Sequence, residues 1–362
     1  MKDKKERRIL VLYTGGTIGM YKENGSGSLK PGGLEEFKGN VNEGVDKLGY
    51  DVEYKPFKFN GEFIDSADAS VEYYNELAEK IASEIDGYDG VVIAFGTDTM
   101  GPSAGALSYM LEGLRKPVVF TGAMLPVGEE GSDGPRNLED AIELVAQSGN
   151  EIPPVNEVSV CFHNKIIRGT HAYKQRSHDI DAFEAPGHDF VGMFEEDESG
   201  SRKININEKE LLPEYPENYE FRLNRLDPSF SVTPLVGVMS IDNIIKNTQD
   251  FSGAYLFYNN EISEERAIEI ESMIPKETPI FFQNHSKRPN PRWLKSEGVV
   301  DYQQMMAKIR YCMSISKDPG EIKKLYESNL RGEGNGEIKR EREILKESDE
   351  SEIIPERELN LK

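Results

Sequence analysis

Three short stretches rich in threonine and glycine each follow a run of apolar residues, and they carry the groups that acyl transfer requires. They are Thr14-Gly-Gly-Thr-Ile-Gly19, Gly96-Thr-Asp-Thr-Met100 and Thr121-Gly-Ala-Met124. A hydroxyl becomes a nucleophile when a base takes its proton, and backbone N–H groups at a glycine turn can bind the oxyanion that forms on the attacked carbonyl. We therefore expect a site where a hydroxyl attacks a carbonyl. The alternative is a set of structural turns, because glycine turns also end strands in proteins without activity.

Each stretch offers a specific group for this chemistry. Two hydroxyls, on Thr14 and Thr17, flank the first turn and are the candidate nucleophiles. The N–H groups near Gly15-Gly16 and Ala123 are candidate oxyanion donors. Asp98 lies between two threonines, and its carboxylate can bind a substrate ammonium group or orient a base.

The sequence does not offer a conventional general base. The five histidines lie in other segments, which argues against Ser-His-Asp chemistry: His163, His171, His178, His188 and His285. Their spacing to cysteines or carboxylates is not typical of a metal site, and we expect no metal. A buried lysine is the remaining candidate, because burial disfavours the ammonium form. Lys174, in Arg168-Gly-Thr-His-Ala-Tyr-Lys174, follows a fourth apolar run; the alternative is an ordinary surface lysine.

The elements that must position these groups alternate along the chain. Continuous apolar runs at 9–13, 91–95, 117–121 and 158–162 predict buried strands, and helical patterns lie between them. This alternation predicts an α/β fold with a doubly wound parallel sheet. The carboxyl ends of parallel strands meet at one edge of the sheet, so the threonine stretches should converge there.

Shifts in composition divide the chain into four parts. We expect a larger N-terminal doubly wound domain over 1–194 and an acidic, polar interdomain linker over 195–232. A smaller C-terminal α/β domain is expected over 233–332. The last part, 333–362, is almost all charge and predicts a tail that is disordered or a frayed helix.

Composition excludes several classes of protein. The formal net charge of −22 argues against nucleic acid as a partner. No apolar stretch approaches the roughly 20 residues of a membrane helix, and no signal-peptide region precedes the first strand. Cys161 and Cys312 both lie in apolar segments, which suits a reducing compartment. We expect a cytoplasmic protein whose acidity reflects a solvated surface or, as the alternative, a high-salt environment.

The threonine stretches, together with Ser132-Asp-Gly-Pro-Arg-Asn-Leu138, resemble the bacterial-type L-asparaginase and glutaminase family. Ile64-Asp-Ser66, Arg168-Gly169 and Asn329-Leu-Arg-Gly-Glu333 look like its cytosolic type I branch in particular. The resemblance covers roughly residues 8 to 190 and resumes near 296 to 333. The first two threonine stretches, in this order and at this spacing, are unlikely to occur together by chance.

The resemblance implies a role for each matching residue. Thr17 matches the nucleophile that forms the acyl-enzyme. Thr97 and Asp98 with Lys174 match a second catalytic group, in which the lysine helps to activate the threonine or water. Asp98 and the segment Asp65-Ser66-Ala67 match the positions that hold the α-ammonium and α-carboxylate of the substrate. The resemblance also implies a homodimer or homotetramer, a small-molecule substrate and no cofactor.

Several positions depart from the family's pattern. Phe95 stands where the family usually has histidine, and Ser66-Ala67-Asp68-Ala69 matches the substrate loop only in part. The family's lid tyrosine has no clean counterpart near Ser28-Leu29; Tyr21 is the substitute, unless it is an exposed loop tyrosine. Phe257-Tyr-Asn-Asn260 replaces a glycine-rich stretch.

We therefore expect an amidohydrolase that converts L-asparagine to L-aspartate and ammonia through a threonine acyl-enzyme. One alternative is the related asparaginase-like subunit of the archaeal glutamyl-tRNA(Gln) amidotransferase. Another is a degenerate amino-acid-binding protein without activity. The sequence leaves open whether asparagine or glutamine is preferred, because one methylene of pocket depth is worth only about 1–3 kcal/mol.

Overall fold

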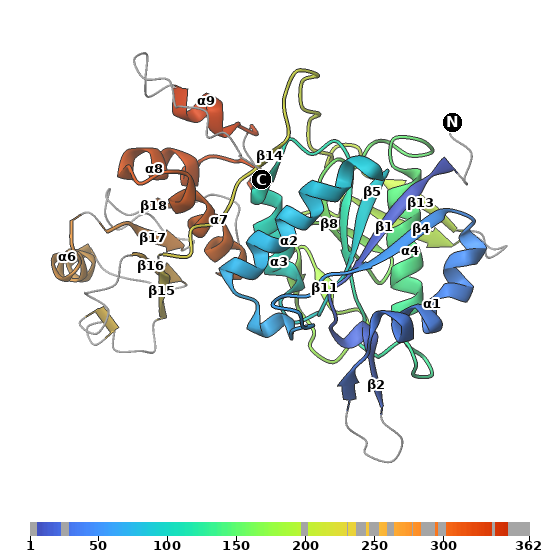
Figure 1. Ribbon diagram of the computed structural model, residues 1–362. Coiled ribbons are helices and arrows are strands. Elements are labelled where there is room, and N and C mark those ends of the chain that lie inside the picture. Colours follow the sequence, from blue (N-terminus) through green and yellow to red (C-terminus); the bar gives the residue numbers. More distant parts are fainter. Residues whose placement is uncertain are drawn as a thin grey trace.

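A computed structural model shows two α/β units, a larger N-terminal one and a smaller one toward the C-terminus (Figure 1). It describes residues 6–22, 29–196, 202–229, 231–236, 244–245, 253–258, 264–276, 278–283, 294–295, 302–334 and 337–346. The predicted fold class is confirmed, whereas the exact domain boundaries stay predictions.

The larger unit is built on an eight-stranded sheet with the order β13-β12-β9-β8-β7-β5-β1-β4. Its parallel part runs from β4 to β8: β1 (Arg8–Tyr13), β4 (Asp51–Pro56), β5 (Gly90–Ala94), β7 (Val118–Thr121) and β8 (Val158–Phe162). All residues of β5, β7 and β8 are buried, as is expected of parallel strands that are covered on both faces.

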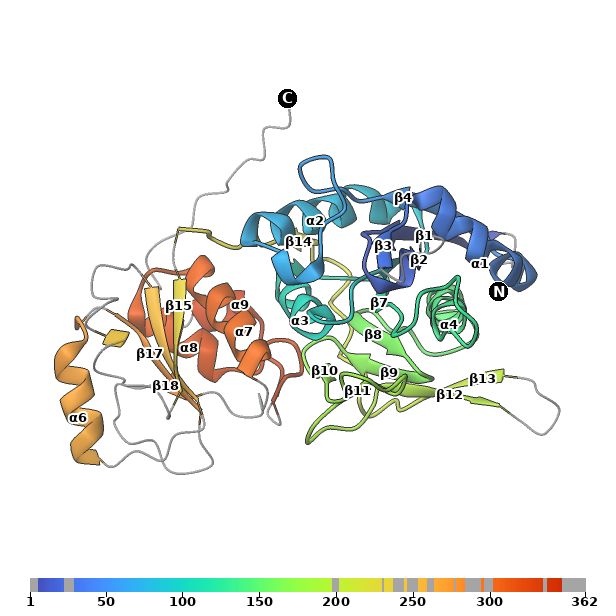
Figure 2. The ribbon, with the colours of Figure 1, turned by 90° about the horizontal axis from the view of Figure 1, so that it is seen from below.

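Helices cover both faces of this sheet, so the doubly wound arrangement is confirmed (Figure 2). The helices are α1 (Leu34–Leu48), α2 (Val71–Glu84), α3 (Met100–Met110) and α4 (Gly134–Gln147). Alternate residues of β1 divide between two apolar cores: Ile9 and Val11 pack with α1 and α4, whereas Leu10 and Leu12 pack with α2 and α3. The strand period of two thus feeds both cores from a single apolar run.

The segment 195–232, predicted as a linker, instead adds structure to the larger unit. Antiparallel strands extend the sheet beyond β8: β9 (Lys165–Arg168), β12 (Gly192–Glu196) and β13 (Arg202–Ile206). The segment 195–232 contributes the end of β12 and all of β13. Further along, β14 (Arg222–Leu223) pairs with β6 (Leu111–Glu112). The acidic composition of the segment fits an edge strand, because one of its faces is solvated.

The smaller unit has a four-stranded parallel sheet of β15 (Ser231–Val236), β16 (Gly253–Tyr258), β17 (Ile280–Gln283) and β18 (Leu294–Lys295). On one face Tyr255, Ile280 and Phe282 pack with α6 (Glu264–Met273). On the other face Leu256 and Phe281 share a core with α7 (Tyr302–Ile315) and α8 (Pro319–Glu327). Because this core also contains residues of α3, it joins the two units (Figure 2).

The charged C-terminal segment is only partly a tail. Glu333 and Glu341 are buried, and Glu341 begins α9 (Glu341–Lys346). Each of these carboxylates has a buried cationic partner, Lys308 and Arg331 respectively, which offsets its desolvation. The described part of 333–362 therefore includes buried ion pairs, in contrast to the prediction, and residues 347–362 lie outside the described residues.

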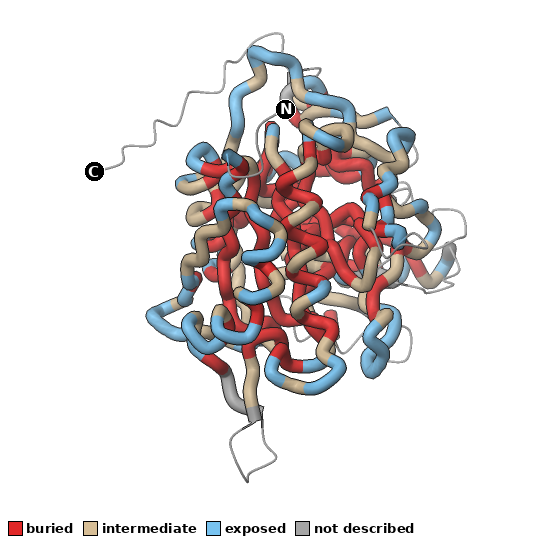
Figure 3. The backbone as a smooth tube through the Cα atoms, turned by 90° about the vertical axis from the view of Figure 1, so that its right-hand side faces the viewer, coloured by how far each residue is buried: buried red, intermediate tan, exposed pale blue. Residues whose placement is uncertain are grey.

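Burial follows this layered arrangement, with buried residues along the central strands and exposed residues on the outer faces of the helices (Figure 3). Within the described ranges, no helix is long and apolar enough to cross a membrane.

Candidate active site

The two threonines of the first turn differ in their surroundings. Thr14 is buried, and its hydroxyl donates to the carbonyl of Ala94 on β5 over 2.9 Å. Thr17 is half-buried and begins a 3₁₀ turn, Thr17–Gly19. Gly16, before it, has a φ of 80°, a conformation that favours glycine. The hydroxyl of Thr14 therefore holds two strands together, and Thr17 is the more accessible of the two candidate nucleophiles.

The first and second turns are in direct contact. A Cβ added to Gly16 would lie 2.6 Å from the Cα of Gly96, closer than any real Cβ approaches. Because Thr17 follows Gly16 and Thr97 follows Gly96, this contact brings the two threonine stretches together, as the sheet topology predicts. The bare glycine backbones are what allow this approach.

Lys174, Thr97 and Asp98 form a hydrogen-bonded cluster. The ammonium of Lys174 donates to the hydroxyl of Thr97 over 2.8 Å and to the carboxylate of Asp98 over 2.7 Å. The Lys174 side chain is 14% exposed, whereas that of Asp98 is 72% exposed. Lys174 is therefore no ordinary surface lysine: it is enclosed, and its nitrogen lies within hydrogen-bond distance of the hydroxyl that it would have to activate.

A short hairpin positions Lys174. Strand β10 (Tyr173–Lys174) pairs antiparallel with β11 (Phe183–Glu184), so that Lys174 lies opposite Phe183. The loop before it contacts the start of α3, where a Cβ on Gly101 would overlap the carbonyl oxygen of Ala172. The cluster thus joins the end of β5 to a hairpin 76 residues further along the chain.

The predicted substrate segment, Asp65-Ser66-Ala67, lies beside the second turn. A Cβ on Gly96 would lie 2.5 Å from the Oγ of Ser66, and the hydroxyl of Thr99 donates to the carbonyl of Ser66 over 2.9 Å. The carboxylate of Asp65 accepts from the N–H of Ala67 over 2.9 Å, which shapes the turn.

The segment Asp65-Ser66-Ala67 does not supply the N-cap of α2. That helix is capped by Ser70, whose Oγ accepts from the N–H of Tyr73.

The third turn is held in place by residues whose role the sequence pattern did not reveal. The hydroxyl of Thr121 donates to the backbone carbonyls of Asn137 and Cys161. A Cβ on Gly122 would lie 3.4 Å from the Cγ2 of Thr97, so the third turn also lies against the second. Ala123, the predicted oxyanion donor, is buried directly after it.

The carboxylate of Asp133 accepts from the N–H of Met124, and Asn137 donates to both Asp133 and the carbonyl of Gly122. Both residues lie at the start of α4, within the motif 132–138, and membership of that motif is the sequence signal that could have revealed their role.

Two departures from the family pattern have a clear place in the structure. Tyr21 is half-buried on β2 (Met20–Lys22), directly after the turn that begins with Thr17, and its catalytic role stays a prediction. Hairpin β2–β3 continues to β3 (Leu29–Pro31), and the other position named for this tyrosine includes Ser28, which lies outside the described residues.

Phe95 is fully buried, with ring centroids 5.3 Å from Phe120 and 6.3 Å from Tyr73. An apolar aromatic cluster therefore lies behind the second turn.

The described ranges contain no cluster of three or more histidine, cysteine or acidic side chains that could hold a metal ion. Both cysteines are buried and unoxidised. Burial raises the pKa of the Cys312 thiol to about 12, which makes it a poor nucleophile at neutral pH.

Comparisons with known proteins show which family the chain is similar to. Residues 8–209 match the sequence model of a family described as "Asparaginase, N-terminal". "L-asparaginase 1" of Escherichia coli (strain K12) is 37% identical over 185 residues, covering 50% of this chain and 52% of that protein. The match thus spans about half the length of this curated relative.

Two further likenesses extend over most of the chain. "L-asparaginase" of Thermococcus kodakarensis is 27% identical over 354 residues, covering 91% of this chain and 99% of that protein. A solved structure, "The thermostable L-asparaginase from Thermococcus kodakarensis", matches with a TM-score of 0.76 and 23% identity, covering 91% of this chain and 100% of that one. The structural likeness shows that the two-unit fold is shared.

Proposed function

We propose that this chain, which belongs to the asparaginase family, hydrolyses the side-chain amide of L-asparagine to L-aspartate and ammonia. The observation that supports the proposal is the contact between the Gly16 and Gly96 turns, because the first turn leads into Thr17 and the second into the cluster of Thr97, Asp98 and Lys174. We assign the nucleophile, the base and the carboxylate of the reaction to this edge of the sheet.

In the first step the Oγ of Thr17 attacks the carbonyl carbon of the side-chain amide. The N–H groups of Gly16 and Ala123 stabilise the oxyanion, and Tyr21 takes part in removing the Thr17 proton. That proton leaves with the amide nitrogen as ammonia, and an ester to Thr17 remains. The engagement of Thr14 with Ala94 supports Thr17 as the attacking residue.

In the second step a water molecule cleaves the ester and releases aspartate. Thr97, Asp98 and Lys174 form the group that activates this water. The contact of the Lys174 nitrogen with both partners supports this role, because that nitrogen lies within hydrogen-bond distance of the Thr97 hydroxyl.

Charged groups on the substrate find complementary partners in the same region. We assign Asp98 to the α-ammonium, since its exposed carboxylate faces solvent beside the turns. The segment Asp65-Ser66-Ala67 holds the α-carboxylate through Ser66 and the backbone. The reaction needs no cofactor in this scheme, and we further propose a homodimer or homotetramer in the cytoplasm.

Ammonia release from L-asparagine and L-glutamine tests the proposal directly. Thr17→Ala should lower kcat by about 10³-fold or more, and Thr97→Ala by about 10²–10³-fold, because each loses a group that reacts or moves a proton. Thr14→Ser, which keeps the hydroxyl that binds Ala94, is the matched control and should leave kcat unchanged.

The alternatives give different outcomes in the same assay. Ammonia release that requires an added partner subunit would favour the amidotransferase function. Tight aspartate binding by calorimetry, without turnover of either amide at any salt concentration, would mean a non-catalytic binding protein and would overturn the proposal.

A further inference from the structure

A buried glutamine on α7 connects the two segments that carry the catalytic cluster. The Nε2 of Gln304 donates to the carbonyl oxygens of Gly101 over 2.9 Å, Gly169 over 3.0 Å and Ala172 over 3.1 Å. The residue is 2% exposed, so these bonds are shielded from water. One amide group therefore bridges the start of α3 and the loop that leads to β10.

Both bridged segments end at the cluster. Gly101 follows the turn with Thr97 and Asp98 within four residues, and Ala172 precedes Lys174 by two. The hydrogen bonds of Gln304 therefore hold the segment of the base beside the segment of its partners. Without this bridge, Lys174 would still be held by the pairing of β10 with β11.

The surface of α3 is shaped to accept this side chain. A Cβ on Gly105 would overlap the Oε1 of Gln304, and a Cβ on Gly101 would overlap the carbonyl oxygen of Ala172. Glycine inside a helix costs about 1 kcal/mol relative to alanine, so two glycines four residues apart on one face indicate a required close approach. Gly105 makes room for the amide, and Gly101 makes room for the loop.

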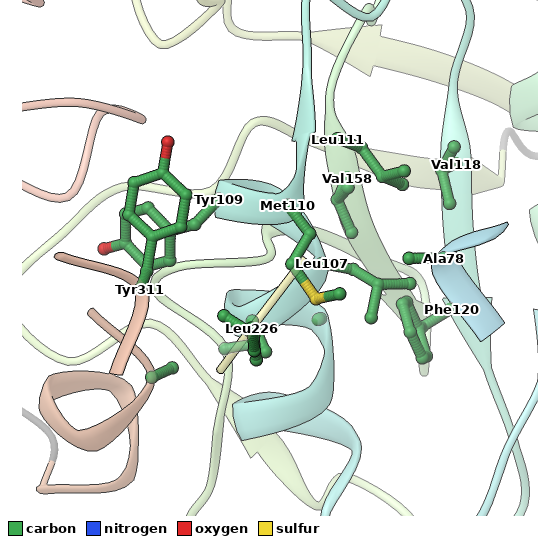
Figure 4. Close-up of a cluster of buried hydrophobic side chains, with 14 of the residues drawn as sticks. Ala78, Leu107, Tyr109, Met110, Leu111, Val118, Phe120, Val158, Leu226 and Tyr311 are labelled. Carbon is green, nitrogen blue, oxygen red and sulfur yellow. The ribbon is translucent and has the colours of Figure 1, made fainter. Parts of the chain in front are cut away.

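The helix that carries Gln304 is itself fixed against α3. The rings of Tyr109 on α3 and Tyr311 on α7 are stacked, with centroids 5.3 Å apart (Figure 4). The hydroxyl of Tyr311 donates to Glu341 over 2.7 Å. Gln304 thus projects from a rigid support, which is the condition for positioning another group accurately.

We propose that Gln304 is a positioning residue that holds Lys174 at hydrogen-bond distance from Thr97 and Asp98. This inference rests on the proposed function. In this role Gln304 acts through the carbonyls of Gly169 and Ala172, to which it donates. Proton transfer depends steeply on geometry, and a displacement of 1 Å can cost about 10²-fold in rate.

A double-mutant cycle tests the inference in kinetics. Gln304→Met keeps the length of the side chain but removes its donors, and it should lower kcat by about 10- to 100-fold with little change in KM. In a Lys174→Met background the same substitution should have no further effect, because no base remains to be positioned. Equal losses in both backgrounds, or no loss in the first, would overturn the proposal.

The control is Ile309→Val, a buried position on the same helix. It should lower the melting temperature without lowering kcat, which separates positioning from general loosening of α7.

Hydrogen–deuterium exchange tests the same inference without any activity. Gln304→Met should accelerate exchange in peptides covering 169–175, whereas Ile309→Val should not. If the wild-type chain releases no ammonia, the proposed function fails, but faster exchange at 169–175 still supports the bridge to Lys174. Unchanged exchange there would overturn it whatever the activity.

Discussion

At the scale of single residues, the chemistry depends on whether Lys174 works as a base or only as a charge. Arginine keeps the charge but does not lose its proton in proteins, so Lys174→Arg separates the two roles. If Lys174 must become neutral, both Lys174→Met and Lys174→Arg should lower kcat for ammonia release by about 10²–10⁴-fold.

Lys116→Met is a suitable control for this comparison. Its ammonium donates to backbone carbonyls near residue 88, before β5 rather than at the site. We expect lower stability and unchanged kcat. Substantial activity in Lys174→Arg would contradict the role of a base and would favour electrostatic stabilisation by the ammonium.

His171 makes a separate prediction about stability. Burial, together with the adjacent His188, whose stacked ring has its centroid 3.6 Å away, lowers the pKa of His171 to about 2. Its Nε2 donates to the carbonyl of Gly332 over 2.8 Å, a bond that raises the pKa but by less than burial lowers it. In the unfolded chain His171 binds a proton with a pKa near 6.5, whereas in the folded chain it stays neutral. The free energy of unfolding therefore falls as the pH drops below about 6.5.

The slope should reach at most about 1.4 kcal/mol per pH unit, measured by urea unfolding between pH 7 and pH 4.5. His171→Gln offers an amide donor for Gly332 without a titrating ring and should flatten this slope. His178→Gln, at an exposed position, is the control. An unchanged slope in His171→Gln would mean that other groups cause the acid sensitivity.

At the scale of elements, the contact between two glycine turns is what assembles the site. Gly16→Ala places a Cβ against the backbone of Gly96 at a φ of 80°, which alanine rarely adopts. The turn bearing Thr97 must then move, and we expect kcat/KM to fall by at least about 10-fold.

The matched substitution is Gly39→Ala inside α1, where an added Cβ meets no atom within 4 Å. It should stabilise the chain by about 0.5–1 kcal/mol and leave kcat/KM unchanged. Wild-type kinetics in Gly16→Ala would show that the two turns need not touch for activity.

The same elements explain how far the sequence predicts the site. Strands β1, β5 and β7 are continuous apolar runs that end in glycine and threonine, so local pattern and sheet topology predict that their turns meet. Asp133 and Asn137 lay within a recognised stretch, but a polar residue at a helix start reads first as a cap. No sequence pattern points to Gln304, because the residues that it contacts lie 132 or more positions away along the chain.

At the scale of the whole molecule, charge patterns misled the prediction. With a net charge of −22, acidic segments are naturally expected on the surface, and so 195–232 and 333–362 were predicted as connection and tail. Burial of Glu333 and Glu341 is possible only because Lys308 and Arg331 meet them, and such pairing depends on tertiary structure. Sequence composition contains no information on which charges will be paired.

The pair of Lys308 on α7 and Glu333 gives the last prediction, about how the C-terminal segment is held. Their side chains are both 1% exposed, with 2.6 Å between Nζ and Oε1. Burial raises the pKa of Glu333, but Lys308 and the N–H groups of Leu330 and Arg331 lower it more, so the carboxylate stays ionised. Lys308→Met leaves this charge buried beside an apolar side chain and should cost about 3–5 kcal/mol in urea unfolding.

Removal of both charges should be much less harmful than the sum of the single losses. We expect Lys308→Met combined with Glu333→Gln to recover about 1–3 kcal/mol relative to additivity, because the glutamine is neutral and can still accept from the N–H of Leu330. Additive losses would mean that Lys308 acts mainly through the carbonyl of Ser328, to which it also donates. Gly332, next to Glu333, accepts hydrogen bonds from both Arg168 and His171. Loss of the Lys308–Glu333 pair should therefore also loosen the segment that leads to Lys174.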